Sequence, residues 1–342
     1  MTKTKTKMSD AMQIEIYDLM IKARVMEERL IRMSKSGLGF FWIGGPGEEA
    51  FNVPLGFLIK KGEGLDYDFL HFHYRQSATL LAMGIPMIDP IRQMHDTATD
   101  PYSGGRNFVN HFAIKKWNVV NVTSPIEVQY ALCIGSGVAQ KRHGGDAITI
   151  VTGGDAGTAE GEFASCLIWA SRKGRELPIL IIVTNNKWGI STPASEVQPG
   201  TTIASRGEAM GIKSKVISGN DPLVSYAAIE EAMAYVRKER KPYLLEVMVS
   251  RLYGHSSASG ANWVNGEDDC IVTFEKHLKE KNILKTEDFK KVREKYEKES
   301  VESLKQVMTE AKPDPNSIFD HVFVDRKDCE IPKPHWMKQA KE

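Results

Sequence analysis

The fold is decided by Ala147-Ile148-Thr149-Ile150-Val151-Thr152-Gly153-Gly154-Asp155-Ala156-Gly157, an apolar run that ends in glycines and an aspartate. An uncharged, β-branched run of this length is typical of a buried parallel strand. A second such run, 177–183, ends shortly before Asn185-Asn186. Between the two runs, apolar residues recur at helical spacing: Phe163, Cys166, Leu167 and Ala170. Strand, helix and strand of this length predict a right-handed βαβ crossover.

Polar residues follow both predicted strands. Asp155 and Asn186 are then expected just past the carboxyl ends of neighbouring parallel strands, where open α/β sheets bind ligands. A carboxylate and an amide oxygen suit a hard cation such as Mg²⁺, and glycines let backbone N–H groups approach a phosphate. The alternative is a turn in which Asp155 only caps a helix. Because the Asn pair follows at this spacing, we favour a site for a metal diphosphate.

The composition excludes several classes of function. The chain has 342 residues, 42% of them hydrophobic, and a net charge of +1, which gives no general basic field for nucleic acid. No apolar run approaches the roughly 20 residues of a membrane span. Residues 1–8 are polar and basic without an apolar signal core, so we expect a disordered arm and a cytoplasmic chain. The four cysteines, Cys133, Cys166, Cys270 and Cys329, lack CxxC spacing and are expected to be thiols.

The sequence predicts three stretches. Residues 1–65 form an arm and a helical segment, and residues 66–265 alternate strands with helices, as in a mostly parallel sheet covered on both faces. Residues 266–342 form a charged helical segment, from Lys276 to Glu310, and a tail. The expected fold class is therefore α/β with helical extensions at both ends.

Three more segments are placed to reach the same crevice. Ser124-Pro125-Ile126-Glu127 has the form of a capping box, and a helix start is also an anion site, so Ser124 either caps a helix or faces a ligand. Arg75, after the predicted strand at 67–73, offers donors to phosphate oxygens, although a surface ion pair is the commoner role. His255 follows the strand at 242–249 and is suited to proton transfer, although most loop histidines have no such role.

Two groups of aromatic residues also have both a functional and a structural explanation. His71 and His73 alternate on one predicted strand, which is the spacing of a metal pair, but ordinary packing is the better interpretation without a third ligand. Phe40, Phe41 and Trp42 precede a glycine-rich turn and either line a substrate pocket or belong to the core.

Taken in order, these segments resemble the alpha subunit of the first component of the thiamine diphosphate-dependent 2-oxo acid dehydrogenases. The resemblance extends from about residue 12 to residue 310. It rests on Gly47-Glu48-Glu49-Ala50, Tyr74-Arg75, Ser124-Pro125, Gly154-Asp155, Asn185-Asn186 and residues 251–256. Ala156 departs from the family pattern, which has glycine there, and so do residues 257–262.

The resemblance implies roles for individual residues. Tyr74 and Arg75 would bind the diphosphate, His255 would be catalytic, and Asp155, Asn186 and the carbonyl of Trp188 would bind Mg²⁺. The full set implied to contact the cofactor is Tyr74, Arg75, Ser124, Ile126, Gly154, Asp155, Ala156, Gly157, Asn186, Trp188, Ile190 and His255. Ser256 matches a position that is phosphorylated in some eukaryotic relatives.

The resemblance also implies the reaction and the partners. The chain would take part in oxidative decarboxylation of a 2-oxo acid, with transfer of the acyl group to a lipoyl-bearing acyltransferase component. It would hold only the diphosphate half of the cofactor site and act with a beta subunit as an α₂β₂ heterotetramer. Residues 186–193 and Gly161-Glu162-Phe163 look more like the branched-chain members, so branched-chain 2-oxo acids are favoured, with pyruvate second.

Other classes of function stay open at this point. Acetoin dehydrogenase and the amino-terminal half of a split transketolase also use thiamine diphosphate. A dinucleotide-dependent oxidoreductase is disfavoured because no G-x-G-x-x-G follows the first strand. A non-catalytic scaffold subunit is disfavoured because Asp155, Asn186 and His255 are all present.

Overall fold

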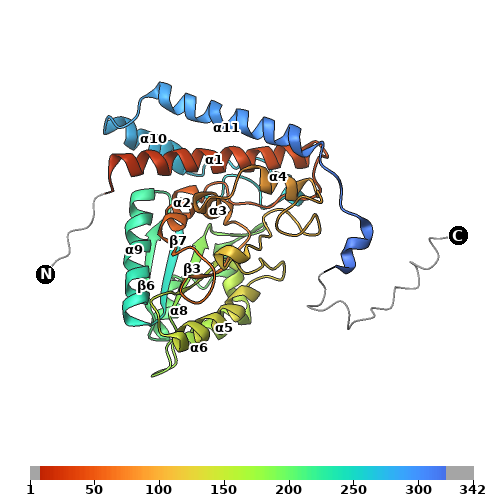
Figure 1. The fold of residues 1–342 in the computed structure, drawn as a ribbon. Helices are drawn as coiled ribbons and strands as arrows, with labels where there is room; N and C mark the ends of the chain where they lie inside the picture. Colours follow the sequence, from red (N-terminus) through yellow and green to blue (C-terminus); the bar gives the residue numbers. More distant parts are fainter. Residues whose placement is uncertain (1–7, 321–342) are drawn as a thin grey trace.

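The computed structural model describes residues 8–320 (Figure 1). The predicted arm lies outside this range except for Met8, as do Cys329 and most of the predicted tail. The α-helices of the described residues are α1 (Asp10–Lys35), α2 (Glu49–Leu58), α3 (Ser77–Met83), α4 (Ile88–Met94), α5 (Val128–His143), α6 (Gly161–Ala170), α7 (Ala194–Val197), α8 (Ala204–Ala209), α9 (Pro222–Glu239), α10 (Cys270–Glu280) and α11 (Thr286–Val307).

The centre of the fold is a five-stranded parallel sheet in the order β1-β2-β3-β7-β6. The strands are β1 (Phe69–His71), β2 (Thr149–Gly154), β3 (Ile179–Asn185), β6 (Lys213–Ser218) and β7 (Tyr243–Met248), and a small hairpin pairs β4 (Trp188–Gly189) with β5 (Thr192–Pro193). The predicted crossover from β2 through α6 to β3 is confirmed, with Thr149 paired to Ile179.

Helices cover both faces of this sheet because its strands are apolar on both. In β3, Leu180 and Ile182 belong to a core shared with α1, α2 and α9, whereas Ile179 and Ile181 belong to a second core with α5 and α6. Figure 1 shows α9 along one side of the sheet and α5 and α6 together below it. The predicted α/β class with a parallel sheet is therefore confirmed.

Several predicted boundaries differ from the structure. The strand predicted at 67–73 is limited to β1 (Phe69–His71), so His73 lies beyond its end rather than on the same strand. The edge strand β6 was not predicted, because it is mostly lysine and serine and only Ile217 in it is buried, so it lacks the apolar run of the other strands. The helix predicted from Lys276 to Glu310 is divided between α10 and α11.

The predicted capping box was wrong. Helix α5 begins at Val128, and the residue before it, Glu127, has a φ of 63° and makes no side-chain cap. Ser124 is exposed and its hydroxyl lies 3.1 Å from Nε2 of His111. The backbone turns left-handed at Glu127, so Ser124 is too far from the first helical N–H groups to cap them.

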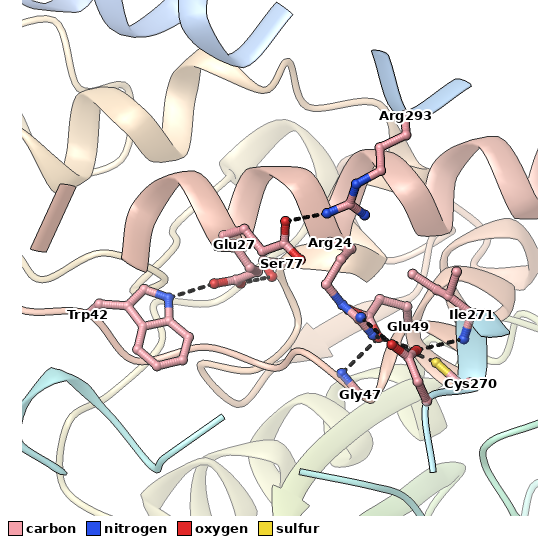
Figure 2. A network of polar contacts seen from close by, with 11 residues as sticks. Arg24, Glu27, Trp42, Gly47, Glu49, Ser77, Cys270, Ile271 and Arg293 are labelled. Atoms are coloured by element: carbon pink, nitrogen blue, oxygen red, sulfur yellow. Dashed lines mark hydrogen bonds and ion pairs between the residues drawn. The ribbon is translucent and has the colours of Figure 1, made fainter. Parts of the chain in front are cut away.

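The two ends of the described chain pack together. Helix α1 lies alongside α11 and also contacts α2, α3 and α10 (Figure 1). Figure 2 shows the buried contacts beneath α1, where Arg24 meets Glu49 at the start of α2. Nε of Arg24 donates to Glu49 at 2.7 Å, and its Nη1 donates to Asp269 before α10 at 2.8 Å. One guanidinium thus ties three helices together.

The predicted division at residues 65/66 and 265/266 stays a prediction.

A second buried carboxyl, Glu27 of α1, lies against the glycine-rich turn at Gly44. Glu27 accepts hydrogen bonds from Nε1 of Trp42 at 2.8 Å, from Oγ of Ser77 at 2.5 Å and from Nδ2 of Asn110 (Figure 2). Trp42 is therefore a core residue, whereas Phe40 is 86% exposed. Among residues 8–320, no helix is long and apolar enough to cross a lipid bilayer.

We predict that Arg24→Met destabilises the chain by about 3–5 kcal/mol, because it leaves Glu49 buried with its countercharge removed. Lys290→Ala is the matched control: it removes an exposed ion pair to Glu294 and should cost less than about 0.5 kcal/mol. Urea unfolding monitored by circular dichroism measures both free energies. Equal losses for the two variants would contradict the role given to Arg24.

Candidate functional site

Four strands of the sheet deliver polar residues to one edge. Because the strands are parallel and in register, with Gly154 opposite Thr184 and Asn185 opposite Met248, their carboxyl ends lie together. Asp155 follows β2, Asn186 follows β3, Arg75 follows β1 and His255 follows β7. Residues far apart in the sequence therefore meet at this edge, as predicted for an open α/β sheet.

A cavity of about 290 Å³ lies at this edge. Every residue predicted to contact the cofactor lines it except Ser124: Tyr74, Arg75, Ile126, Gly154, Asp155, Ala156, Gly157, Asn186, Trp188, Ile190 and His255. A larger cavity of about 740 Å³, between α9, β6 and α10, contains none of these residues. We place the candidate site in the smaller cavity because titratable and backbone polar groups converge there.

Asp155 is a buried carboxyl that faces backbone N–H groups. Burial raises its pKa to about 6, and this rise is opposed by hydrogen bonds from the N–H groups of Ala156 and Asn186 and by the charge of Arg75. Asp155 makes no side-chain cap to the short turn that follows it, so the alternative of a simple capping residue has no support. A buried carboxylate of this kind gains most from a cation in contact with it.

The loop after Asn186 folds back over the strand end. Oδ1 of Asn186 accepts the N–H of Trp188 at 3.0 Å, and the β4–β5 hairpin follows. Gly189 lies against Ala156: a Cβ on Gly189 would lie 2.8 Å from the Cβ of Ala156. The departure from the family pattern at Ala156 is therefore accommodated by a missing side chain across the loop.

Arg75, which is buried, and His255, which is half-buried, form a pair in the cavity. Nη2 of Arg75 lies 3.1 Å from Nδ1 of His255, and its Nη1 donates to the carbonyl of Gly44. A guanidinium can only donate, so Nδ1 of His255 is the acceptor and the ring proton lies on Nε2. Burial, together with the charges of Arg75 and Arg251, lowers the pKa of His255 to about 4. His255 is therefore a neutral imidazole with a donor N–H.

The turn at residues 44–50 contacts the guanidinium of Arg75 through Gly44 and Glu48. Glu48 is buried with Oε1 3.8 Å from Nε of Arg75, and burial raises its pKa to about 7 although Arg75 opposes the rise. Gly47 has a φ of 107°, and a Cβ there would lie 2.4 Å from the carbonyl oxygen of Ser250. The turn thus needs glycine at this position. None of Phe40, Phe41 and Trp42 lines the cavity, so their predicted role in a substrate pocket has no support there.

Four residues that line the cavity were not in the set predicted from the sequence: His73, Glu127, Glu160 and Gly189. His73 directly precedes Tyr74, and Glu127 directly follows Ile126, so adjacency to predicted residues was the available signal. His111, also missed, lies behind the site, stacked on Tyr74 at 6.4 Å and within 3.1 Å of Ser124.

His71 and His73 are held separately. Nε2 of His71 lies 2.8 Å from the hydroxyl of Ser136, and burial lowers the pKa of both rings. Within residues 8–320, no three His, Cys, Asp or Glu side chains are grouped to hold a metal ion. Any metal at the cavity would therefore need ligands of other kinds, such as the amide of Asn186 or backbone carbonyls.

Comparison with known proteins identifies the family. The family model described as "Dehydrogenase E1 component" matches residues 17–316. The 2-oxoisovalerate dehydrogenase subunit alpha of Bacillus subtilis is 29% identical over 82% of this chain and 86% of its own length. The mitochondrial 2-oxoisovalerate dehydrogenase subunit alpha of Mus musculus is 27% identical over 91% of this chain and 70% of its own length. The mitochondrial 2-oxoisovalerate dehydrogenase subunit alpha 2 of Arabidopsis thaliana is 27% identical over 92% of this chain and 67% of its own length. The chain therefore belongs to the dehydrogenase E1 component family, which confirms the family and the dehydrogenase class predicted from its sequence.

Proposed function

We propose that this chain is the alpha subunit of a branched-chain 2-oxo acid dehydrogenase that binds the diphosphate of thiamine diphosphate, with Mg²⁺, in the cavity at the sheet edge. The observation that carries the proposal is the convergence of residues from four strand ends on one cavity, including all but one of the predicted set. The names of the relatives support the branched-chain substrate, since each is called a 2-oxoisovalerate dehydrogenase alpha subunit.

The residues of the cavity suit this cofactor. Arg75 is buried and presents a fixed cation to phosphate oxygens, and the ring of Tyr74 lies beside its guanidinium and is stacked on His111. Asp155 and Asn186, with the carbonyl of Trp188, would hold Mg²⁺ through oxygen atoms. When bound, the thiazolium ring would supply the electron sink for decarboxylation, while the protein supplies orientation and electrostatics.

His255 would act through its Nε2–H. The Nδ1 atom is held by Arg75, so the ring orientation is set before substrate enters. A neutral donor in a partly buried site can stabilise negative charge that develops on a substrate oxygen, or pass a proton to it. This role does not require His255 to be charged at neutral pH.

We further propose that the chain acts with a beta subunit, in an α₂β₂ assembly, and that a lipoyl-bearing acyltransferase accepts the acyl group. The relatives are called alpha subunits, which supports the beta partner. The heterotetramer and the lipoyl carrier remain predictions of the resemblance, and a cytoplasmic location remains a prediction from residues 1–8. A scaffold subunit without catalysis is the second candidate, favoured only by the altered loop at residues 257–262.

We predict that Asp155→Asn weakens Mg²⁺-dependent binding of thiamine diphosphate at least about 100-fold, because it removes the carboxylate charge opposite the cation. Isothermal titration calorimetry of the chain purified with its native beta subunit measures this. Glu196→Gln, an exposed carboxyl on α7, is the control and should change the affinity less than about twofold. Unchanged affinity in the Asp155 variant would rule out its role as metal ligand.

We predict that His255→Ala lowers kcat about 100-fold or more in the assembled enzyme. The ratio of wild-type to variant activity should stay constant between about pH 5.5 and 8.5, because the lowered pKa keeps His255 neutral down to about pH 4. His143→Ala is the control, since His143 is exposed and bonded to Asp66. A ratio that changes near pH 6.5 would contradict a neutral His255.

We predict that the chain purified with its native beta subunit reduces an acceptor dye faster with 3-methyl-2-oxobutanoate than with pyruvate, by at least about tenfold in kcat/KM. Extra apolar contacts to the branched chain are the physical reason. The chain alone should show no turnover. Preference for pyruvate would overturn the substrate, and turnover without a partner would overturn the need for a beta subunit.

A further inference from the structure

One buried carboxyl of the cavity has no role in the function proposed above. Glu127 lies between Ile126 and the start of α5, is 2% exposed and lines the same cavity. Its φ of 63° is left-handed, which is unfavourable for a residue other than glycine and persists only where the surroundings hold it. The fold therefore places this side chain firmly at the strand end.

The glycines of the β2 loop make room for Glu127. A Cβ on Gly153 would lie 2.3 Å from Oε2 of Glu127, and a Cβ on Gly157 would lie 1.8 Å from Oε1. Oε1 also accepts the backbone N–H of Gly154 at 3.2 Å, and Oε2 accepts from Nε2 of Gln129 at 3.2 Å. The loop that was expected to face a phosphate thus already wraps a carboxyl.

The groups around Glu127 disfavour negative charge in this part of the cavity. Burial raises its pKa to about 8; the N–H of Gly154 opposes this rise, and the carboxylates of Asp155 and Glu160 add to it. The other ionisable groups that act on it are the phenols of Tyr74 and Tyr130. Its own hydrogen-bond partners, Gly154 and Gln129, carry no charge that would offset a diphosphate placed beside it.

We propose that Glu127 is an affinity-determining residue of the cofactor site, whose carboxyl competes with the diphosphate for the backbone N–H of Gly154 and weakens its binding. This inference rests on the proposed function, because it assumes that the diphosphate enters this cavity. A backbone N–H donates one strong hydrogen bond, so the carboxyl and a phosphate oxygen cannot both accept it well.

The test is calorimetric titration of the full chain with inorganic diphosphate in excess Mg²⁺, and with Mg²⁺ alone. Glu127→Gly removes the carboxyl and suits the left-handed backbone, and Glu127→Ala removes the carboxyl while keeping a Cβ. Both should bind Mg²⁺-diphosphate about tenfold more tightly than the wild-type chain, because no side-chain oxygen then competes for the N–H of Gly154. Two variants keep the test decisive if one of them fails to fold.

The matched control is Glu196→Gln, which removes an exposed carboxylate on α7 that does not line the cavity. Its affinity should stay within about twofold of the wild-type value. An equal gain in this variant would show a general charge effect and overturn the competition. Weaker binding of Mg²⁺ alone by Glu127→Ala would overturn it too, since Glu127 would then be a metal ligand.

The failures of the two proposals are distinguishable. Binding of Mg²⁺-diphosphate that is equal in the wild-type chain and in both Glu127 variants overturns this inference and leaves the cofactor site in place. No binding by the wild-type chain or any variant overturns the cofactor site itself, and this inference with it. Binding by the Glu127 variants alone supports both.

Discussion

The structure depends on the shared direction and register of four neighbouring strands. Because β1, β2, β3 and β7 are parallel, each ends at the same edge, and the next few residues of each strand point polar groups into one volume. The apolar strands themselves are covered on both faces, so this edge is where the sheet offers unpaired backbone and side-chain polar groups. The position of the cavity thus follows from the order and direction of the strands, and the loops supply the residues that line it.

Two buried arginines, Arg24 and Arg75, each connect several segments of the chain. Arg24 ties α1 to α2 and α10 through Glu49 and Asp269, and Arg75 ties β1 to the 44–50 turn and to His255. The two arginines differ in what surrounds them. Arg24 is matched by two carboxylates in direct contact, whereas Arg75 meets a carbonyl, an imidazole and a more distant Glu48. Arg75 therefore retains positive charge for a ligand.

The sequence predicted the sheet class, the crossover through α6 and the strand-end positions of Asp155 and Asn186, since these can be located from apolar runs. Most of the other residues predicted to line the cavity were implied by the family resemblance. The sequence did not predict what depends on contacts between loops. The alternative in which Ser124 caps α5 is excluded, because the left-handed backbone at Glu127 changes the start of the helix. Gly157 lines the cavity as expected, but the space that a Cβ on it would occupy is taken by Glu127, which local spacing did not indicate. Local spacing carries no information about which side chain fills a glycine's space.

The contact between Ala156 and Gly189 has an evolutionary consequence. The two residues come from the ends of different strands, yet a Cβ added at Gly189 would lie only 2.8 Å from the Cβ of Ala156. Substitutions at these positions are therefore epistatic: with alanine at 156, a side chain at 189 requires the two loops to move apart, so the cost of either change depends on the other residue. Neither position can be judged for tolerance without knowing the residue at the other.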